Sequence, residues 1–379
     1  MGKTRLLGKL VGNALRYRYL HLTGRPISLE SISLEVTHRC ICRCRMCNIW
    51  QISDAVKDLP LSVWTDLLSS PELHALRELD ITGGEPFLRD DLRDLLKWVS
   101  HSKPEKFPQL RTIAITTNGI LTDRVLEVTA EIIGPLREQA IDLVLACGLD
   151  AVGELHDDIR NLKNAWTKLS STLAGLTKLR DENSNLILGI KTTLVPDNVS
   201  ELDKIAEFAR NNQLFTIISP RIITANRFGN LELKEDLQFD AEDIEAIKEF
   251  YSGPAFEWDG HRLAMLHYLS TGEVIKPCSA GYNTVFVRHT GDVFPCPLIP
   301  SSLGNIRAAT LKSLLGCPAA YAFRKQICTF AECKTCTEPG LERLAWPFEG
   351  LTCLRQLSRL GFRKFDKLSK HMGLDKYLS

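Results

Sequence analysis

The sequence lacks the features of a membrane-spanning or exported protein. Its 379 residues contain no apolar run long enough to cross a bilayer. The first twenty residues are interrupted by Lys3, Arg5, Lys9, Arg16 and Arg18, so they contain no apolar core of a signal peptide. We therefore expect a cytoplasmic protein.

An excess of charge of one sign is also missing. Lys and Arg number 47 against 46 Asp and Glu, which gives a formal net charge of +1, and 44% of the residues are hydrophobic. This composition is ordinary for a globular chain, and it gives no reason to expect nucleic acid as a partner. No internal repeat or low-complexity segment stands out. A chain of this length can form one large domain, or a core domain with a smaller second one.

The chain does contain twelve cysteines. In a reducing compartment, clustered cysteines bind metal more often than they form disulfides. Seven of them stand in spacings typical of metal ligands, namely Cys40, Cys44, Cys47, Cys278, Cys296, Cys333 and Cys336. The other five are Cys42, Cys147, Cys317, Cys328 and Cys353. Cys147 lies in an apolar stretch and is predicted to be a small buried hydrophobic residue.

Short strand-like segments alternate with amphipathic helical patterns between residues 30 and 220. The strand candidates are Ile32–Val36, Leu79–Thr82, Thr112–Thr117, Ile141–Leu145, Leu186–Thr192 and Phe215–Ser219. Repeated strand–helix units imply parallel strands joined by right-handed crossovers. We predict the α/β class, with a partial (β/α)6 barrel followed by a small C-terminal cysteine-rich domain. The pattern alone also allows an open doubly wound sheet.

The chain is expected to divide into five segments. These are a basic N-terminal extension (1–27), the barrel core (28–225), a linking helical region (226–270), a cysteine-rich domain (271–345) and a basic amphipathic C-terminal tail (346–379). We expect metal, rather than a large apolar core, to hold the cysteine-rich domain together. The two basic ends can pack onto the barrel as surface helices, which we favour, or make a peripheral contact with an anionic membrane.

The first cysteine cluster follows the first strand candidate directly. Cys40, Cys44 and Cys47 have the spacing C-x3-C-x2-C. Three thiolates can hold three corners of a [4Fe–4S] cubane and leave one iron open for a small chelating molecule. A structural zinc site with His38 as fourth ligand is an alternative, and Cys42 could replace a member of the triplet.

The second strand candidate ends in Gly83-Gly84-Glu85-Pro86. Two glycines at the C-terminal end of a parallel strand let the backbone approach a ligand closely, at the edge where such folds bind ligands. Alone, this pattern would indicate only a tight loop.

A second cluster lies downstream. Cys278 is followed by twelve residues, Gly291, four residues and Cys296, and later by the pair Cys333 and Cys336. Four cysteines in two pairs are consistent with zinc or with an iron–sulfur cluster. The apolar segments 285–287 and 293–294 predict a hairpin between the first two cysteines.

The first cysteine triplet and the glycine-rich strand end together resemble the radical S-adenosylmethionine (SAM) superfamily, over roughly residues 28–225. The resemblance implies that the three cysteines hold a [4Fe–4S] cluster whose fourth iron is chelated by SAM. It further implies that the reduced cluster cleaves SAM to methionine and a 5′-deoxyadenosyl radical, which abstracts hydrogen from a substrate. A dry barrel interior would protect the radical. Flavodoxin or ferredoxin would supply the electron.

The same resemblance implies a set of residues that bind SAM. These are Met46 near the adenine, Gly83, Gly84, Glu85 and Pro86 at the second strand end, Asn118 after the third strand, and Asp150 after the fourth. Asn118 and Asp150 could equally be ordinary turn residues. Relatives usually carry serine at the position of Gly148, so no side-chain contact to SAM is expected there.

The second cluster resembles the auxiliary-cluster domains called SPASM and twitch. The resemblance implies one auxiliary [4Fe–4S] cluster on Cys278, Cys296, Cys333 and Cys336, where four cysteine ligands would favour an electron-accepting role. One alternative is a second auxiliary cluster that uses Cys317, Cys328 or Cys353. Another is a structural zinc site in place of the auxiliary cluster.

We expect a radical SAM enzyme that modifies a peptide or protein side chain, with the auxiliary cluster assisting oxidation or bond formation. The alternatives are a radical SAM dehydrogenase of a small molecule or lipid, and a non-enzymatic zinc or iron–sulfur protein. No general acid or base can be assigned from the sequence.

Overall fold

The computed structural model describes residues 3–53, 55–254 and 259–371, so the last eight residues of the predicted C-terminal tail and the first two of the N-terminal extension lie outside it. Six parallel strands lie side by side in the order β6-β5-β4-β3-β2-β1. They are β1 (Ser31–Glu35), β2 (Glu78–Thr82), β3 (Thr112–Thr117), β4 (Asp142–Gly148), β5 (Leu186–Leu194) and β6 (Phe215–Pro220). Each overlaps one of the predicted strands, so the prediction of six parallel strands is confirmed.

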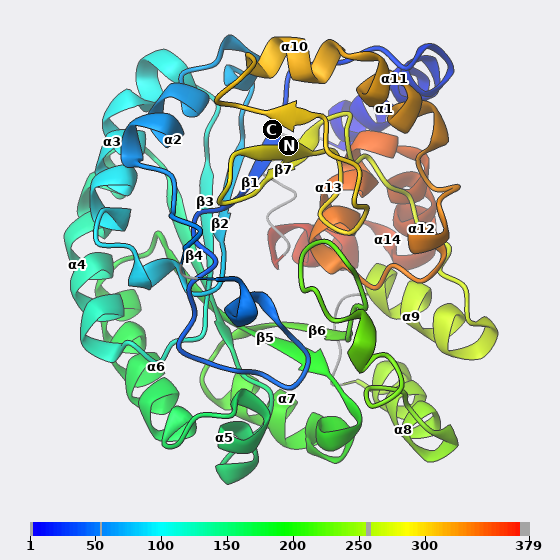
Figure 1. The fold of residues 1–379 in the computed structure, drawn as a ribbon. Coiled ribbons are helices and arrows are strands. Elements are labelled where there is room, and N and C mark those ends of the chain that lie inside the picture. The colour runs from blue at the N-terminus through cyan, green and yellow to red at the C-terminus, as the bar shows by residue number, and fades with distance from the viewer. Residues whose placement is uncertain (1–2, 54, 255–258, 372–379) are drawn as a thin grey trace.

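Helices connect these strands and cover the outer, convex face of the sheet, while the other face surrounds the interior (Figure 1). The connecting helices are α2 (Leu61–Leu68), α3 (Leu92–Lys106), α4 (Thr122–Glu138), α5 (Glu154–Arg160), α6 (Ala165–Glu182) and α7 (Leu202–Asn211). Short 3-10 turns lie at Ile49–Gln51, Pro71–Leu73, Pro86–Leu88, Pro196–Glu201 and Leu231–Leu233. Because the helices between the strands lie on one face only, the sheet forms the predicted partial barrel and not a doubly wound sheet.

The alternation of side chains along each strand explains the two faces. Leu34, Leu79 and Ile81 are fully buried and belong to the large apolar core between sheet and helices. Ser33 and Asp80 alternate with them and face the barrel interior. The interior therefore carries short and polar side chains on several strands.

The cysteine-rich region extends the same sheet. β7 (Thr284–Val287) pairs in parallel with β1, and β8 (Asp292–Phe294) pairs with β7 as the antiparallel hairpin that the sequence predicted. β9 (Gly304–Asn305) completes a nine-stranded sheet. The pairing of β7 with β1 was not anticipated, because the sequence suggested a separate small domain held by metal.

The remaining helices form the other side of the molecule (Figure 1). They are α1 (Lys3–Thr23), α8 (Ala241–Ser252), α9 (Asp259–Thr271), α10 (Leu311–Gly316), α11 (Pro318–Gln326), α12 (Ala331–Lys334), α13 (Pro339–Glu349) and α14 (Leu351–His371). α14 is broken at Gly361, whose φ of 73° is not helical. α1 packs against α11, α13 and α14 through a face that includes Leu10 and Ala14. Among the described helices, none combines the length and the apolar character needed to cross a bilayer.

Candidate active site and metal centres

The first cysteine loop lies directly on the end of β2. The backbone N–H of Gly84 donates to the carbonyl of Thr37, and that of Glu85 donates to the carbonyl of Arg39, both at 2.8 Å. A Cβ on Gly84 would lie 2.2 Å from the Arg39 carbonyl oxygen, and one on Gly83 would lie 2.5 Å from that of Thr37. The two glycines are therefore required by the cysteine loop itself, whatever ligand the strand end also meets.

Gly84→Ala is expected to lower the free energy of unfolding by about 1–3 kcal/mol or more. The new methyl group would clash with backbone atoms of the cysteine loop, which cannot move aside as a flexible side chain can. The measurement is the apparent unfolding midpoint of the iron-loaded protein, together with its iron content. Gly12→Ala is the matched control, since Gly12 lies on helix α1 with nothing within 4 Å of a new Cβ. The control should be neutral or stabilising by up to about 1 kcal/mol. Equal behaviour of the two variants would contradict this packing.

A cavity of about 160 Å³ collects most of the predicted SAM-site residues. Its lining includes Cys40, Cys44, Cys47, Met46, Gly83, Gly84, Asn118 and Asp150. Trp50 and Phe228 add aromatic side chains to this lining. The contacts of these residues with SAM stay predictions.

Glu85 and Pro86 do not line this cavity. The Glu85 carboxylate is fully buried and accepts hydrogen bonds from the Asn118 N–H (2.7 Å), the Thr117 hydroxyl (2.8 Å) and the Phe87 N–H (3.1 Å). Burial raises the pKa of Glu85 to about 7, against the effect of these hydrogen bonds. Glu85 thus ties the end of β2 to the end of β3 and positions the strand ends around the cavity.

The thiols of the first loop have different surroundings. The Cys42 thiol is hydrogen-bonded to those of Cys40 and Cys44, and it also lines the cavity. Asn118 Nδ2 lies 4.0 Å from Cys40 Sγ, and Arg160 Nη1 lies 3.8 Å from Cys44 Sγ. The hydrogen bond from Cys42 outweighs burial and, together with Arg160, lowers the pKa of Cys44 to about 7. Donors directed at Cys40 and Cys44 suit thiolate ligands.

His38 does not join these thiols. Its ring packs against that of His289, with ring centroids 4.6 Å apart, and its Nδ1 lies 3.8 Å from Asp58 Oδ1. It is not among the residues that line the cavity. The zinc alternative that used His38 as the fourth ligand therefore finds no support in this geometry.

Arg160 is a site residue that the sequence analysis missed. Its Nε lies 2.7 Å from Asp150 Oδ2, and its guanidinium group lines the cavity. A Cβ on Gly148 would lie 2.3 Å from Arg160 Nη2. The absence of a side chain at Gly148 therefore leaves room for the guanidinium group. The signal in the sequence was a basic residue at the end of the short helix that follows β4.

Asp150 is bound on both of its oxygens. Its Oδ1 accepts the Thr193 N–H at 3.0 Å, and its Oδ2 pairs with Arg160. Burial raises the pKa of Asp150, and the positive charge of Arg160 opposes that rise. Asp150 therefore holds Arg160 at the cavity wall and links the ends of β4 and β5.

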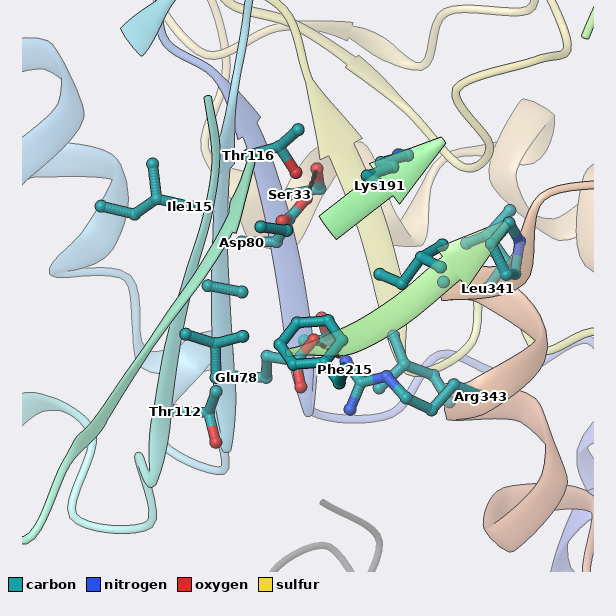
Figure 2. Close-up of a pocket in the computed structure, with 18 of the residues that line it drawn as sticks. Ser33, Glu78, Asp80, Thr112, Ile115, Thr116, Lys191, Phe215, Leu341 and Arg343 are labelled. Carbon is teal, nitrogen blue, oxygen red and sulfur yellow. Dashed lines mark hydrogen bonds and ion pairs between the residues drawn. The ribbon is translucent and has the colours of Figure 1, made fainter. Parts of the chain in front are cut away.

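A larger cavity of about 620 Å³ occupies the barrel interior (Figure 2). Thr116, Lys191, Arg227 and Glu338 line both this cavity and the smaller one, so the two adjoin. Barrel interiors are usually filled by bulky branched side chains. Here, several interior positions of the strands carry small residues, among them Ser31, Ser33, Thr112, Ala114 and Ala146.

Apolar and polar groups divide the wall of the large cavity. Leu188, Phe215, Phe286 and Leu341 supply apolar surface. Phe215 can lie across the strands because its neighbour Gly189 has no Cβ, which would come within 2.4 Å of the ring. The cysteine-rich region and α13 contribute part of the wall and close the open side of the barrel.

Four charged residues lie at or near the junction of the two cavities. Arg227 donates to Thr82 Oγ1 at 3.0 Å, and its guanidinium carbon lies 5.4 Å from the Phe286 ring centroid. Although burial opposes it, Lys191 and Arg227 hold the pKa of Glu338 below its usual value. Burial raises the pKa of Asp80, whose Oδ2 accepts the Ser33 hydroxyl at 2.5 Å.

Sequence reasoning gave none of these four a role. Asp80 and Lys191 are charged residues in otherwise apolar strands, which signals an interior-facing position. Arg227 follows β6, in the segment assigned to the linking region, and Glu338 lies two residues past the second cysteine pair.

The second cysteine cluster is also brought together. Cys278, Cys296, Cys333 and Cys336 lie around one apolar cluster that contains Tyr282 and Phe323. Burial raises the pKa of Cys333 to about 11 and raises those of Cys296 and Cys336 as well. Buried thiols become thiolates when a metal supplies the compensating charge, so this donor set fits a bound iron–sulfur cluster.

The five other cysteines are placed differently. The Cys328 thiol is hydrogen-bonded to that of Cys278, so a fifth thiol reaches the auxiliary site. Cys317 Sγ accepts the Ala320 N–H at the start of α11, and Cys353 is buried in the main apolar core. Cys147 is fully buried there too, as predicted. A second auxiliary cluster built on Cys317 and Cys353 gains no support from these positions.

Comparisons with known proteins identify both parts of the chain. Residues 34–209 match the model of the radical SAM superfamily, and residues 278–337 match SPASM, an iron–sulfur cluster-binding domain. The chain therefore contains a radical SAM domain followed by a SPASM domain. Its cofactors are accordingly SAM, a SAM-binding [4Fe–4S] cluster and an auxiliary [4Fe–4S] cluster, and the two groups of thiols described above fit them.

Radical SAM relatives of this chain differ in their named functions. The antilisterial bacteriocin subtilosin biosynthesis protein AlbA of Bacillus subtilis is 21% identical over 301 residues, which is 78% of this chain and 61% of AlbA. The chain thus spans less than two thirds of that relative. The AdoMet-dependent heme synthase of Methanosarcina barkeri is 24% identical over 255 residues, 62% of this chain and 67% of the synthase.

A solved radical SAM structure shares the fold. Streptococcus suis SuiB bound to its precursor peptide SuiA superimposes with a TM-score of 0.57 at 14% identity, covering 83% of this chain and 71% of SuiB. At this identity the likeness is one of fold.

Proposed function

We propose that this radical SAM enzyme removes hydrogen from a peptide or protein side chain held in the 620 Å³ cavity, and completes an oxidation there. The observation that carries the proposal is the contact between the two cavities along Thr116, Lys191, Arg227 and Glu338. A group bound in the large cavity would lie directly against the SAM pocket. The volume is in the range of ligand pockets.

Bound SAM and its cluster supply hydrogen-atom abstraction, and the auxiliary cluster supplies an acceptor for one electron. Cys296 is flanked by Pro295 and Pro297, which line the large cavity, so the auxiliary thiols lie behind its wall. A substrate that loses a hydrogen atom, one further electron and a proton undergoes a two-electron oxidation.

Asp80 is the group placed to take up the proton. Its carboxylate lines the cavity, the Ser33 hydroxyl fixes its orientation, and burial raises its pKa. A raised pKa makes a carboxylate a stronger base. Lys191 and Arg227 would bind and orient a polar group of the substrate, while the apolar wall excludes water.

The peptide assignment is supported by the named roles of AlbA, in bacteriocin biosynthesis, and of SuiB, which was solved with a precursor peptide. A small molecule is the second candidate, because the cavity is large enough for a whole ligand and the heme synthase relative acts on one.

Deuterium transfer separates these candidates. Cells grown in deuterated medium provide a macromolecular and a small-molecule fraction, and each is incubated anaerobically with reduced enzyme and SAM. We expect deuterium in 5′-deoxyadenosine from the macromolecular fraction only. Transfer from the small-molecule fraction alone would overturn the peptide assignment, and no 5′-deoxyadenosine at all would overturn the radical SAM activity.

Asp80→Asn is expected to keep deuterium transfer and to lower formation of the oxidised product by about 10²–10⁴-fold, because only the proton acceptor is lost. Mass spectrometry of 5′-deoxyadenosine and of the product measures the two steps separately. Ser33→Ala is the matched control and should have a smaller effect, because it leaves the carboxylate in place. Loss of deuterium transfer in Asp80→Asn would instead assign Asp80 to substrate binding.

A further inference from the structure

Helix α1 has two apolar faces, and the described part of the chain covers only one of them. Leu10, Ala14 and Leu20 are buried against the rest of the protein. On the opposite side, Leu7, Val11, Leu15 and Leu22 are exposed by 37%, 48%, 67% and 76%. Their spacing of four, four and seven residues places them on one line along the helix. We refer to these four leucine and valine residues as the α1 stripe.

The exposed apolar surface of the molecule is concentrated here. Ten large hydrophobic residues are exposed in the described part of the chain, and five of them belong to α1: the stripe and Tyr19. Tyr321 of α11 is a sixth, and its ring lies beside Gly24, just past the end of α1. Exposed apolar side chains gathered along one helix mark an interaction site. The exposed Arg18 lies between Leu15 and Leu22 on the same line of the helix.

The N-terminal segment that carries the stripe is rich in basic residues. Residues 1–26 contain Lys3, Arg5, Lys9, Arg16, Arg18 and Arg25 and no acidic residue, although the whole chain is nearly neutral. The Lys325 ammonium lies 5.0 Å from the Tyr321 ring centroid, at the same end. α14, which contacts α1, adds the exposed Arg355, Arg359 and Arg363.

The helix is held firmly while it presents the stripe. Asn13 Nδ2 donates to the Pro347 carbonyl at 2.7 Å, and the Tyr17 hydroxyl donates to the Cys278 carbonyl at 3.0 Å. These hydrogen bonds hold α1, and with it the stripe, in a fixed position. Through Tyr17, the helix also contacts Cys278, one of the proposed ligands of the auxiliary site.

We infer that the α1 stripe docks this protein on the surface of an anionic lipid bilayer. An apolar line on a helix rich in Lys and Arg is the pattern of a helix that lies in the interface plane, where its apolar side chains enter the acyl boundary and its cations meet lipid phosphates. A second copy of the chain fits less well, because a two-fold interface would bring the same basic residues face to face. This inference is independent of the proposed substrate.

Vesicle flotation of the full-length, iron-loaded protein tests the inference. We expect it to float with vesicles of phosphatidylcholine and phosphatidylglycerol, to float less at high salt, and to stay unbound with phosphatidylcholine alone. In the double variant Leu15→Gln with Leu22→Gln, the fraction of protein bound to the anionic vesicles should fall roughly tenfold, because two of the most exposed apolar side chains are removed. Ile275→Gln is the matched control, since Ile275 is 72% exposed but lies outside α1.

Unchanged iron absorbance of the double variant shows that it is folded. Equal binding of the wild type and the double variant to the anionic vesicles would overturn the inference. Failure of the wild type to bind the anionic vesicles would also overturn it. A concentration-dependent dimer in sedimentation that is lost in the double variant would assign the stripe to a second copy instead.

Discussion

Replacing Cys40 with alanine should remove about four of roughly eight irons and abolish formation of 5′-deoxyadenosine from SAM, whereas Cys42→Ala should leave both nearly unchanged. The two residues are a matched pair, since both thiols line the same cavity and are hydrogen-bonded to each other. Iron and sulfide analysis of anaerobic protein, together with the SAM cleavage assay, measures the outcome.

The surroundings of the thiols carry this expectation. Cys40 and Cys44 each have a nitrogen donor within 4.0 Å, from Asn118 and Arg160 respectively. Cys42 is instead buried against Ile120 and Ala165, with 1% of its surface exposed. Donors stabilise thiolates, whereas an apolar environment favours the protonated thiol. Loss of iron in Cys42→Ala, with iron retained in Cys40→Ala, would require a different set of ligands.

The second large effect is expected at the auxiliary site. Cys296→Ala should lose about four irons and should no longer form the oxidised product. It should still cleave SAM to 5′-deoxyadenosine in the absence of substrate. Cys328→Ala should keep the iron, because Cys328 is the exposed member of the five and the other four thiols lie around one apolar cluster. Iron analysis and product analysis of the two variants, side by side, make the comparison.

Two outcomes would contradict this assignment. If Cys328→Ala loses the four irons, Cys328 is a ligand and one of the other four thiols is not. If Cys296→Ala abolishes SAM cleavage as well, the two metal sites are not independent. The hydrogen bond between Cys328 and Cys278 is the reason to test both variants.

Local patterns in the sequence were enough to predict the barrel strands and the grouping of the thiols. Apolar runs between helical patterns predict parallel strands, and Cys40, Cys44 and Cys47 lie close together because they share one short loop. Lys191 and Arg227 could not be assigned in this way, because they meet only after β5 and the loop after β6 fold around the same interior. The pairing of β7 with β1 is likewise a contact between segments about 250 residues apart.

Motif residues also took roles that the motif does not state. Glu85 belongs to the glycine-rich strand end, yet its carboxylate accepts hydrogen bonds from Thr117 and Asn118 and does not line the cavity. At Gly148, the guanidinium group of Arg160 occupies the space that a side chain would fill. Both roles depend on side chains from other strands or helices, which no single stretch of sequence displays.

The parallel ladder between β1 and β7 covers an edge of the barrel that would otherwise present free N–H and C=O groups. A fragment cut before the cysteine-rich region would expose that edge, along the strand that leads into the first cysteine loop. Such an edge invites pairing with other chains, so we expect a fragment of the barrel alone to aggregate.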